Sequence, residues 1–249
     1  MKIFLDVGAH TGETLQAVLN PKYKFDKIVC FEPVEACCRV LANFQDPRIE
    51  ICPFGLWRET CDAPIFAPGG LGANIFEDQG AEAGSEVCRL VRASDWFGAN
   101  ISKGHQVFLK LNCEGSECDI VDDLLSSGEY EKVHAVMIDF DARKIQSQKH
   151  RPQEVLERLR ALGVGNYMLS EEAMIGPTHV ARIQHWLRLV DGPDHPRLGL
   201  ANAVRYVYLP YVGNFLRFFG ARNLLRRLLP ERGYLLVRSA WRGLKQLGS

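Results

Sequence analysis

The feature that most constrains this chain is the alternation of apolar runs and amphipathic segments in its first fifty-odd residues. Residues 2–7, 27–32 and 48–54 have the length and apolar content of buried strands. The segments between them, 14–19 and 34–44, carry apolar residues at helical spacing. Because parallel strands need a crossover helix, this β-α-β-α-β order predicts a Rossmann-like α/β fold with a doubly wound, mostly parallel sheet.

The alternation resumes after a stretch with a weaker pattern. Residues 55–100 are rich in Gly, Ala and Pro, which predicts an irregular lobe or short antiparallel strands. Beyond it we expect strands at 106–111, 132–140, near Tyr167 and at 204–209, and helices at 116–125 and 152–162. A chain of 249 residues fits one main core, so residues 1–209 are expected to form one domain.

Composition narrows the class of protein further. The chain is 47% hydrophobic and 24% charged, as in an ordinary globular protein, and it has no run of about 18 uncharged apolar residues that would span a membrane. Its eight cysteines include no CxxC pair and no Cys/His cluster at zinc-ligand spacing, so no structural metal is expected. The chain starts directly with a strand and shows no export signal, which predicts a cytoplasmic location.

The last forty residues differ in charge from the rest. Residues 210–249 hold eight Arg or Lys and one acid, a net charge of +7, whereas the remainder holds 22 basic and 29 acidic residues, a net charge of −7. Leu236, Ala240, Leu244 and Leu247 recur at helical spacing, which predicts a basic amphipathic helical extension. Three partners fit it: the acidic body, a second copy in a homodimer, or the anionic inner face of a membrane as a peripheral contact. No nucleic-acid partner is expected.

The turn after the first predicted strand carries the first chemical signal. It reads Asp6-Val7-Gly8-Ala9-His10-Thr11-Gly12, and an acid, Glu32, ends the second strand twenty positions after Gly12. A carboxylate at that offset can accept both ribose hydroxyls of an adenosine cofactor, and glycines allow the backbone to approach it closely. The cofactor contacts expected here are Asp6, Gly8, Ala9, His10, Gly12, Glu32 and Pro33.

Two adenosine cofactors compete for this turn. A dinucleotide needs Gly-x-Gly-x-x-Gly, whereas this turn is Gly-x-x-x-Gly after Asp6, whose charge repels phosphate and attracts an ammonium or a sulfonium. S-adenosylmethionine is therefore expected rather than NAD. Two structural alternatives stay open: Asp6 and Glu32 satisfy backbone amides of the turn and the next helix, and His10 either accepts a proton or shapes the loop.

Taken together, these motifs resemble the FkbM-type methyltransferases. Asp6-Val7-Gly8-Ala9 and Phe31-Glu32-Pro33 match two elements of that family, Ser94-Asp95 is similar to a short third, and the segment 110–117 is similar to Lys-Ile-Asp-x-Glu-Gly-x-Glu. The resemblance covers roughly residues 1–209. It implies a class I methyltransferase fold, S-adenosylmethionine as methyl donor, and a small-molecule or glycan acceptor, usually a hydroxyl of a sugar or other secondary metabolite.

One departure from the family concerns the fourth main strand, where the family's Asp is Asn112. An amide can hydrogen-bond the cofactor or the acceptor, but it is neither a carboxylate base nor a strong metal ligand, so no catalytic metal is expected. Glu114 is then the first candidate for the general base and Asp139 the second. Asp139 and Asp141 are expected to face one side by strand alternation. Three interpretations of this pair stay open: it binds an acceptor hydroxyl, it binds a divalent ion, or it consists of solvated acids at a strand end.

Lys110 and Glu117 belong to the same block and are candidates for contacts with the acceptor. The alternatives are an ion pair between Lys110 and Glu114, and a position for Glu117 in the first turn of the following helix. Two other functions also remain open. An NAD-linked oxidoreductase would use the same sheet, and Asn112 is compatible with a non-catalytic binding protein that kept the methyltransferase fold.

Overall fold

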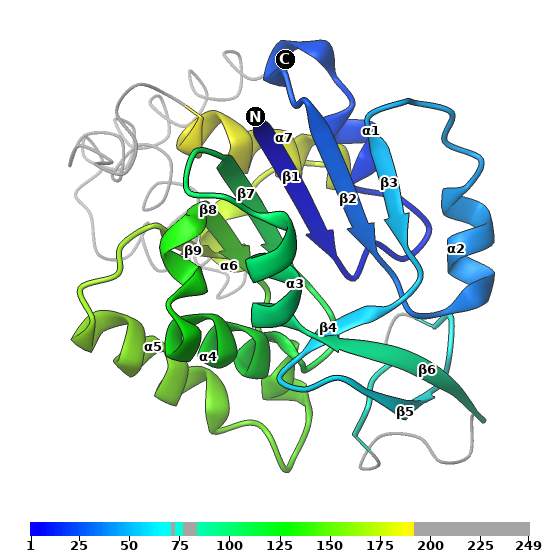
Figure 1. Cartoon of the computed structure of the whole chain (residues 1–249), viewed down its shortest axis with the longest axis vertical. Helices are drawn as coiled ribbons and strands as arrows, with labels where there is room; N and C mark the ends of the chain where they lie inside the picture. The colour runs from blue at the N-terminus through cyan, green and yellow to red at the C-terminus, as the bar shows by residue number, and fades with distance from the viewer. Residues whose placement is uncertain (71–72, 77–83, 192–249) are drawn as a thin grey trace, which may run out of the picture. The chain divides into compact units, whose positions relative to one another are not determined.

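The computed structural model describes residues 1–70, 73–76 and 84–191 (Figure 1). Its central sheet consists of β1 (Lys2–Val7), β2 (Lys27–Phe31), β3 (Ile49–Cys52), β7 (Gln106–Leu111), β8 (Val133–Ile138) and β9 (Tyr167–Leu169). The strand order is β3-β2-β1-β7-β8-β9, and every neighbouring pair is parallel. In chain order this is 3-2-1-4-5-6, the doubly wound Rossmann-like arrangement, so the predicted fold class is confirmed.

Each face of the sheet has its own apolar core, because successive strand residues point to opposite sides. Leu5 of β1 faces the core that is covered by α3 (Ala93–Asn100), α4 (Glu117–Ser127) and α5 (Arg151–Ala161). Phe4 faces the other core, under α1 (Leu15–Val18), α2 (Glu35–Leu41) and α7 (His179–Val190). Burial on both faces explains why the strands of the sequence read as continuous apolar runs.

A second sheet is inserted between β3 and β7. It contains β4 (Gly55–Trp57), β5 (Cys61–Phe66) and β6 (Ser85–Arg92), in the order β4-β6-β5. The expected short antiparallel strands are confirmed for β5 and β6, but β4 pairs in parallel with β6. Pro64 lacks an N–H and is tolerated because β5 is an edge strand. The regular helix α3 was not expected in this stretch.

The segment after β9 contains helices that the sequence interpretation missed: α6 (Ser170–Ala173) and α7. Helix α7 begins after Thr178, whose hydroxyl accepts the N–H of Ala181 at 3.1 Å as an N-terminal cap. The predicted strand 204–209 and the basic extension 210–249 lie outside the described residues. None of the helices within the described ranges has both the length and the hydropathy of a membrane span.

Helix α7 should contribute much of the stability of its face through Trp186. This side chain is fully buried and meets the Phe4 ring edge-on, with ring centroids 6.1 Å apart. We expect Trp186→Ala to lower the free energy of unfolding by about 3–5 kcal/mol, measured by urea denaturation. Arg188→Ala, on the exposed side of the same helix, is the control and should change it by about 0.5 kcal/mol or less. Equal urea concentrations at the unfolding midpoint for both variants would contradict the packing role of α7.

Candidate functional site

A cavity of about 440 Å³ lies at the edge of the central sheet where its parallel strands end. Its lining includes Gly8 after β1, Glu32 after β2, Asn112 after β7 and Asp139 after β8. Open α/β sheets bind ligands at this edge, and the volume is in the range of small-molecule sites, about 300–1,000 Å³. The structure therefore brings together most of the residues that the sequence singled out.

The turn after β1 is packed too closely for any side chain at Gly8. Gly8 has a φ of +77°, and a Cβ there would lie 1.9 Å from the carbonyl oxygen of Asn112. The N–H groups of Gly8 and Ala9 both donate to the Phe31 carbonyl at 3.1 Å. Gly12 has a different role, because a Cβ there would meet the Phe44 ring at 2.7 Å. Gly8 thus shapes the cavity, whereas Gly12 allows close packing under it.

Glu32 is buried at the cavity wall and holds two backbone amides. Its Oε2 accepts the N–H of His10 at 2.8 Å, and its Oε1 accepts the N–H of Val34 at 3.0 Å. Burial raises the pKa of Glu32, and these two bonds oppose the shift. A carboxylate offers about four lone-pair sites, so within the described ranges two remain for a ligand. Both interpretations of Glu32 therefore coexist: it fixes the turn, and it faces the cavity.

Asp6 forms a buried ion pair that the sequence did not reveal. The Nζ of Lys110 donates to Asp6 Oδ1 at 2.7 Å and to the Gly8 carbonyl at 3.2 Å. The two residues are register partners on β1 and β7, and Asp6 is fully buried. In this structure its charge is neutralised by Lys110 and does not reach the cavity surface. Because the ammonium of Lys110 pairs with Asp6, the alternative ion pair between Lys110 and Glu114 is wrong.

The loop after β7 has an unusual backbone conformation, which a buried side chain holds in place. Glu114 has a φ of +53° and Gly115 a φ of +117°. Glu117, in the first turn of α4, is fully buried and accepts the N–H groups of Cys113 at 2.8 Å and Gly115 at 3.0 Å. Burial raises the pKa of Glu117 to about 7, against these bonds. Glu117 thus fixes the loop from within, and Glu114 takes a left-handed backbone conformation that is uncommon for residues other than glycine.

Carboxylates gather at the end of the cavity formed by the loops after β7 and β8. Asp139 accepts the Asn112 side-chain N–H at 3.2 Å, and Asp141 contacts the ammonium of Lys144 at 2.7 Å. Strand β8 ends at Ile138 and Asp141 begins a short 3₁₀ helix, so the two acids share the cavity through a turn rather than through strand alternation. Burial, together with the neighbouring Asp141, raises the pKa of Glu114 to about 8.

The described part of the chain has no group of three or more His, Cys, Asp or Glu side chains suited to a metal ion.

The ring of His10 contacts Glu13 at 3.0 Å and the Gly69 carbonyl at 3.3 Å. These contacts connect the turn after β1 to the segment after β5, which favours the loop-shaping interpretation of His10.

Two cavity residues, Thr14 and His179, were missed in the sequence. The Nε2 atom of His179, the first residue of α7, lies 3.2 Å from Thr14 Oγ1, and both side chains line the cavity. Burial lowers the pKa of His179, as does the charge of Lys110. Helical spacing of apolar residues at 183, 186, 187 and 190 was the available signal for α7. It could not have shown that the start of α7 meets the turn after β1.

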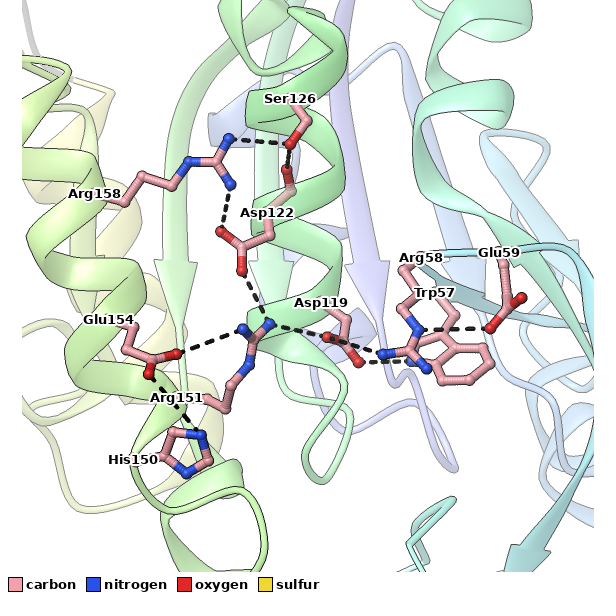
Figure 2. Close-up of polar contacts among 10 residues, drawn as sticks. All are labelled: Trp57, Arg58, Glu59, Asp119, Asp122, Ser126, His150, Arg151, Glu154 and Arg158. Carbon is pink, nitrogen blue, oxygen red and sulfur yellow. Dashed lines mark hydrogen bonds and ion pairs between the residues drawn. The ribbon is translucent and has the colours of Figure 1, made fainter.

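A polar network joins the second sheet to the helices α4 and α5 (Figure 2). Asp119, in the first turn of α4, accepts the Trp57 indole N–H at 2.9 Å and a guanidinium N–H of Arg151 at 3.0 Å. Arg151 also donates to Asp122 at 2.9 Å. The network joins β4, α4 and α5, so that Gly55 of β4, which lines the cavity, is held at a fixed place relative to the loop after β7.

Comparison with known proteins adds little beyond the fold. Neither a protein-family model nor a curated protein sequence matches the chain. Among solved structures it is similar to the crystal structure of methyltransferase FkbM from Methylobacillus flagellatus KT, with 19% identity and a TM-score of 0.42. The alignment covers 63% of this chain and 38% of that chain, so this chain spans well under half the length of the solved protein. A likeness this remote says nothing about the reaction.

The buried ion pair leads to a prediction about stability. Lys110→Met leaves the Asp6 carboxylate buried without its partner, which should cost about 3–5 kcal/mol of unfolding free energy, measured by urea denaturation. Adding Asp6→Asn removes that charge, so the double variant should be more stable than Lys110→Met alone. Arg39→Ala breaks the exposed pair with Glu35 and should have little effect. Additive losses from the two buried substitutions would show that the pair is not coupled.

The position of Glu114 leads to a prediction about titration. In a carbon-13 NMR titration of side-chain carboxyl groups, Glu114 should lose its proton near pH 8, so that it is neutral below this pH and a carboxylate above it. The resonance should disappear in Glu114→Gln and persist in Glu35→Gln, an exposed control. A Glu114 carboxyl that titrates near the ordinary value of about 4.3 would contradict the effect of burial and Asp141.

Proposed function

We propose that this chain is an S-adenosylmethionine-dependent methyltransferase that methylates a hydroxyl of a small-molecule acceptor, such as a sugar, a glycan or another secondary metabolite. The observation that carries the proposal is the cavity itself. One end has the unused acceptor sites of Glu32 beside the Gly8 turn, and the other end has Glu114 and Asp139. A ribose-binding carboxylate and a candidate base thus share one space of about 440 Å³.

The residues present fit S-adenosylmethionine better than a dinucleotide. Gly8 lets the turn pack against the Asn112 carbonyl at the cavity wall, and within the described residues Glu32 has two unused acceptor sites for ribose hydroxyls. Ala9, His10, Pro33 and Asn112 also line the cavity. A pyrophosphate would need a helix N-terminus after the turn, but α1 has only four residues and Gly12 is turned toward Phe44. The carboxylates of Glu13 and Glu32 would repel it as well.

The chemistry follows from these positions. When bound, S-adenosylmethionine would supply an electrophilic methyl group carried by a sulfonium. Transfer of this methyl group to the acceptor would leave a neutral thioether. Holding the acceptor oxygen in line with that methyl group is worth about 7–11 kcal/mol. In its carboxylate form, which is the main form only above about pH 8, Glu114 accepts the hydroxyl proton as the new carbon–oxygen bond forms, a contribution of about 10²–10⁴-fold. Asp139, oriented by the Asn112 amide, accepts a hydrogen bond from a second polar group of the acceptor or serves as the alternative base.

The cofactor assignment depends most directly on Glu32. We expect Glu32→Ala to weaken binding of S-adenosylhomocysteine at least tenfold by calorimetry, because two charge-assisted hydrogen bonds worth roughly 1.5–3 kcal/mol each are lost. Glu35→Ala, which removes an exposed acid three residues away, is the matched control and should leave affinity unchanged. Thermal denaturation of both variants checks the fold. Unchanged affinity in a folded Glu32→Ala protein rules out this assignment.

The same titration separates the rival functions. Binding of NADH without binding of S-adenosylhomocysteine would favour the NAD-linked oxidoreductase. Binding of S-adenosylhomocysteine without turnover on any sugar, glycan or phenol, measured with a radiolabelled methyl donor, would favour a binding protein that kept the fold. The proposed enzyme binds S-adenosylhomocysteine in preference to NADH, and Glu114→Gln reduces its turnover.

A further inference from the structure

In the part of the chain that the structure describes, the ammonium of Lys110 has one hydrogen-bond donor left to offer the cavity. A lysine ammonium has three N–H donors. Within the described ranges two of them are used, by Asp6 Oδ1 at 2.7 Å and by the Gly8 carbonyl at 3.2 Å. Lys110 is only 3% exposed, yet it belongs to the cavity lining. Its third N–H is therefore a desolvated, charged donor at the floor of the cavity.

The contact between His179 and Thr14 supplies a second donor, whichever ring nitrogen of His179 carries the proton. If Nε2 is protonated, it donates to Thr14 Oγ1 at 3.2 Å, and the Thr14 hydroxyl proton is left for a ligand. If Nδ1 is protonated, the hydroxyl donates to Nε2, and the Nδ1 proton is left instead. Both residues line the cavity, and in either tautomer the pair keeps one donor that is not used between its two members.

Lys110 and Glu32 come from strands on opposite sides of β1, and His179, whose pKa is lowered by burial, lies close enough to Lys110 for the lysine charge to lower it further. In the sheet, β1 is flanked by β2, which ends next to Glu32, and by β7, which carries Lys110. Adjacent strands are about 4.8 Å apart, so β2 and β7 are separated by about 10 Å across the carboxyl end of β1. An extended ligand whose ribose meets Glu32 can therefore reach Lys110, beside the contact between Thr14 and His179.

The net charge around Lys110, Thr14 and His179 determines which kind of ligand group can bind there. Lys110 is already paired with Asp6, so the pair is neutral and does not balance a doubly charged phosphate. An α-amino acid end is a neutral zwitterion whose carboxylate can accept two hydrogen bonds. We propose, on the basis of the proposed function, that Lys110, Thr14 and His179 bind the carboxylate at the amino-acid end of S-adenosylmethionine, with His179 as a specificity-determining residue.

The test compares two ligands that differ in this end alone. S-adenosylhomocysteine carries the amino acid, and 5′-methylthioadenosine keeps the adenosine and the sulfur without it. Calorimetry on the full chain should show that the wild type prefers S-adenosylhomocysteine. His179→Ala should weaken S-adenosylhomocysteine about tenfold and change 5′-methylthioadenosine about twofold or less, since a hydrogen bond to a charged group is lost from one ligand only. Thr14→Val should have the same selective effect.

Two further variants sharpen the result. His179→Gln keeps a side-chain N–H and should recover much of the preference, whereas Arg188→Ala, exposed on the same helix, should not alter it. An equal loss for both ligands in His179→Ala, or no loss for either, overturns the inference. A wild type that binds both ligands equally overturns it too, while the proposed function stands. A wild type that binds neither ligand overturns the proposed function and the inference together.

Discussion

The ion pair between Asp6 and Lys110 is the interaction on which the geometry of the cavity depends. It joins β1 to β7 directly below the point where both strands end, and Lys110 also holds the Gly8 carbonyl. Burying two charges costs several kcal/mol per ion, so the pair persists only because its geometry is close and its attraction acts in a low-dielectric core. The turn after β1 is consequently fixed against the neighbouring strand, and Gly8 meets the Asn112 carbonyl without space for a side chain.

The parallel arrangement of the strands brings polar residues together at the carboxyl edge of the central sheet. Since β2, β1, β7 and β8 run in the same direction and are neighbours in the sheet, the residues that follow them converge although they are far apart in the chain. Glu32, Asn112 and Asp139 reach the cavity in this way, each from a different strand end. The loops above the edge are free to carry polar groups because the apolar cores on both faces of the sheet provide the stability.

The two ends of the cavity differ in backbone conformation and in how closely their carboxylates are grouped. At the end near Glu32, the carboxylate is bonded to backbone amides and the glycine turn is clamped to the Phe31 carbonyl. At the other end, Glu114 takes a left-handed backbone conformation over the buried Glu117, and several carboxylates lie close together. The raised pKa of Glu114 is a consequence of burial and of this crowding. Strain and like charges of this kind persist only where the surrounding structure enforces them.

Local pattern was sufficient for the sheet, for most of its helices and for the position of Glu32 at the end of β2, because strand and helix periods record which face of an element is buried. It also indicated the glycine turn, since the offset from Gly12 to Glu32 is a property of one βαβ unit. The partners of individual side chains were decided by tertiary structure. Asp6 and Lys110 are 104 residues apart and meet only through strand register, while His179 reaches Thr14 across 165 residues because α7 packs beside α1. Such contacts leave no periodic trace in the sequence, and they determine which charges face the cavity.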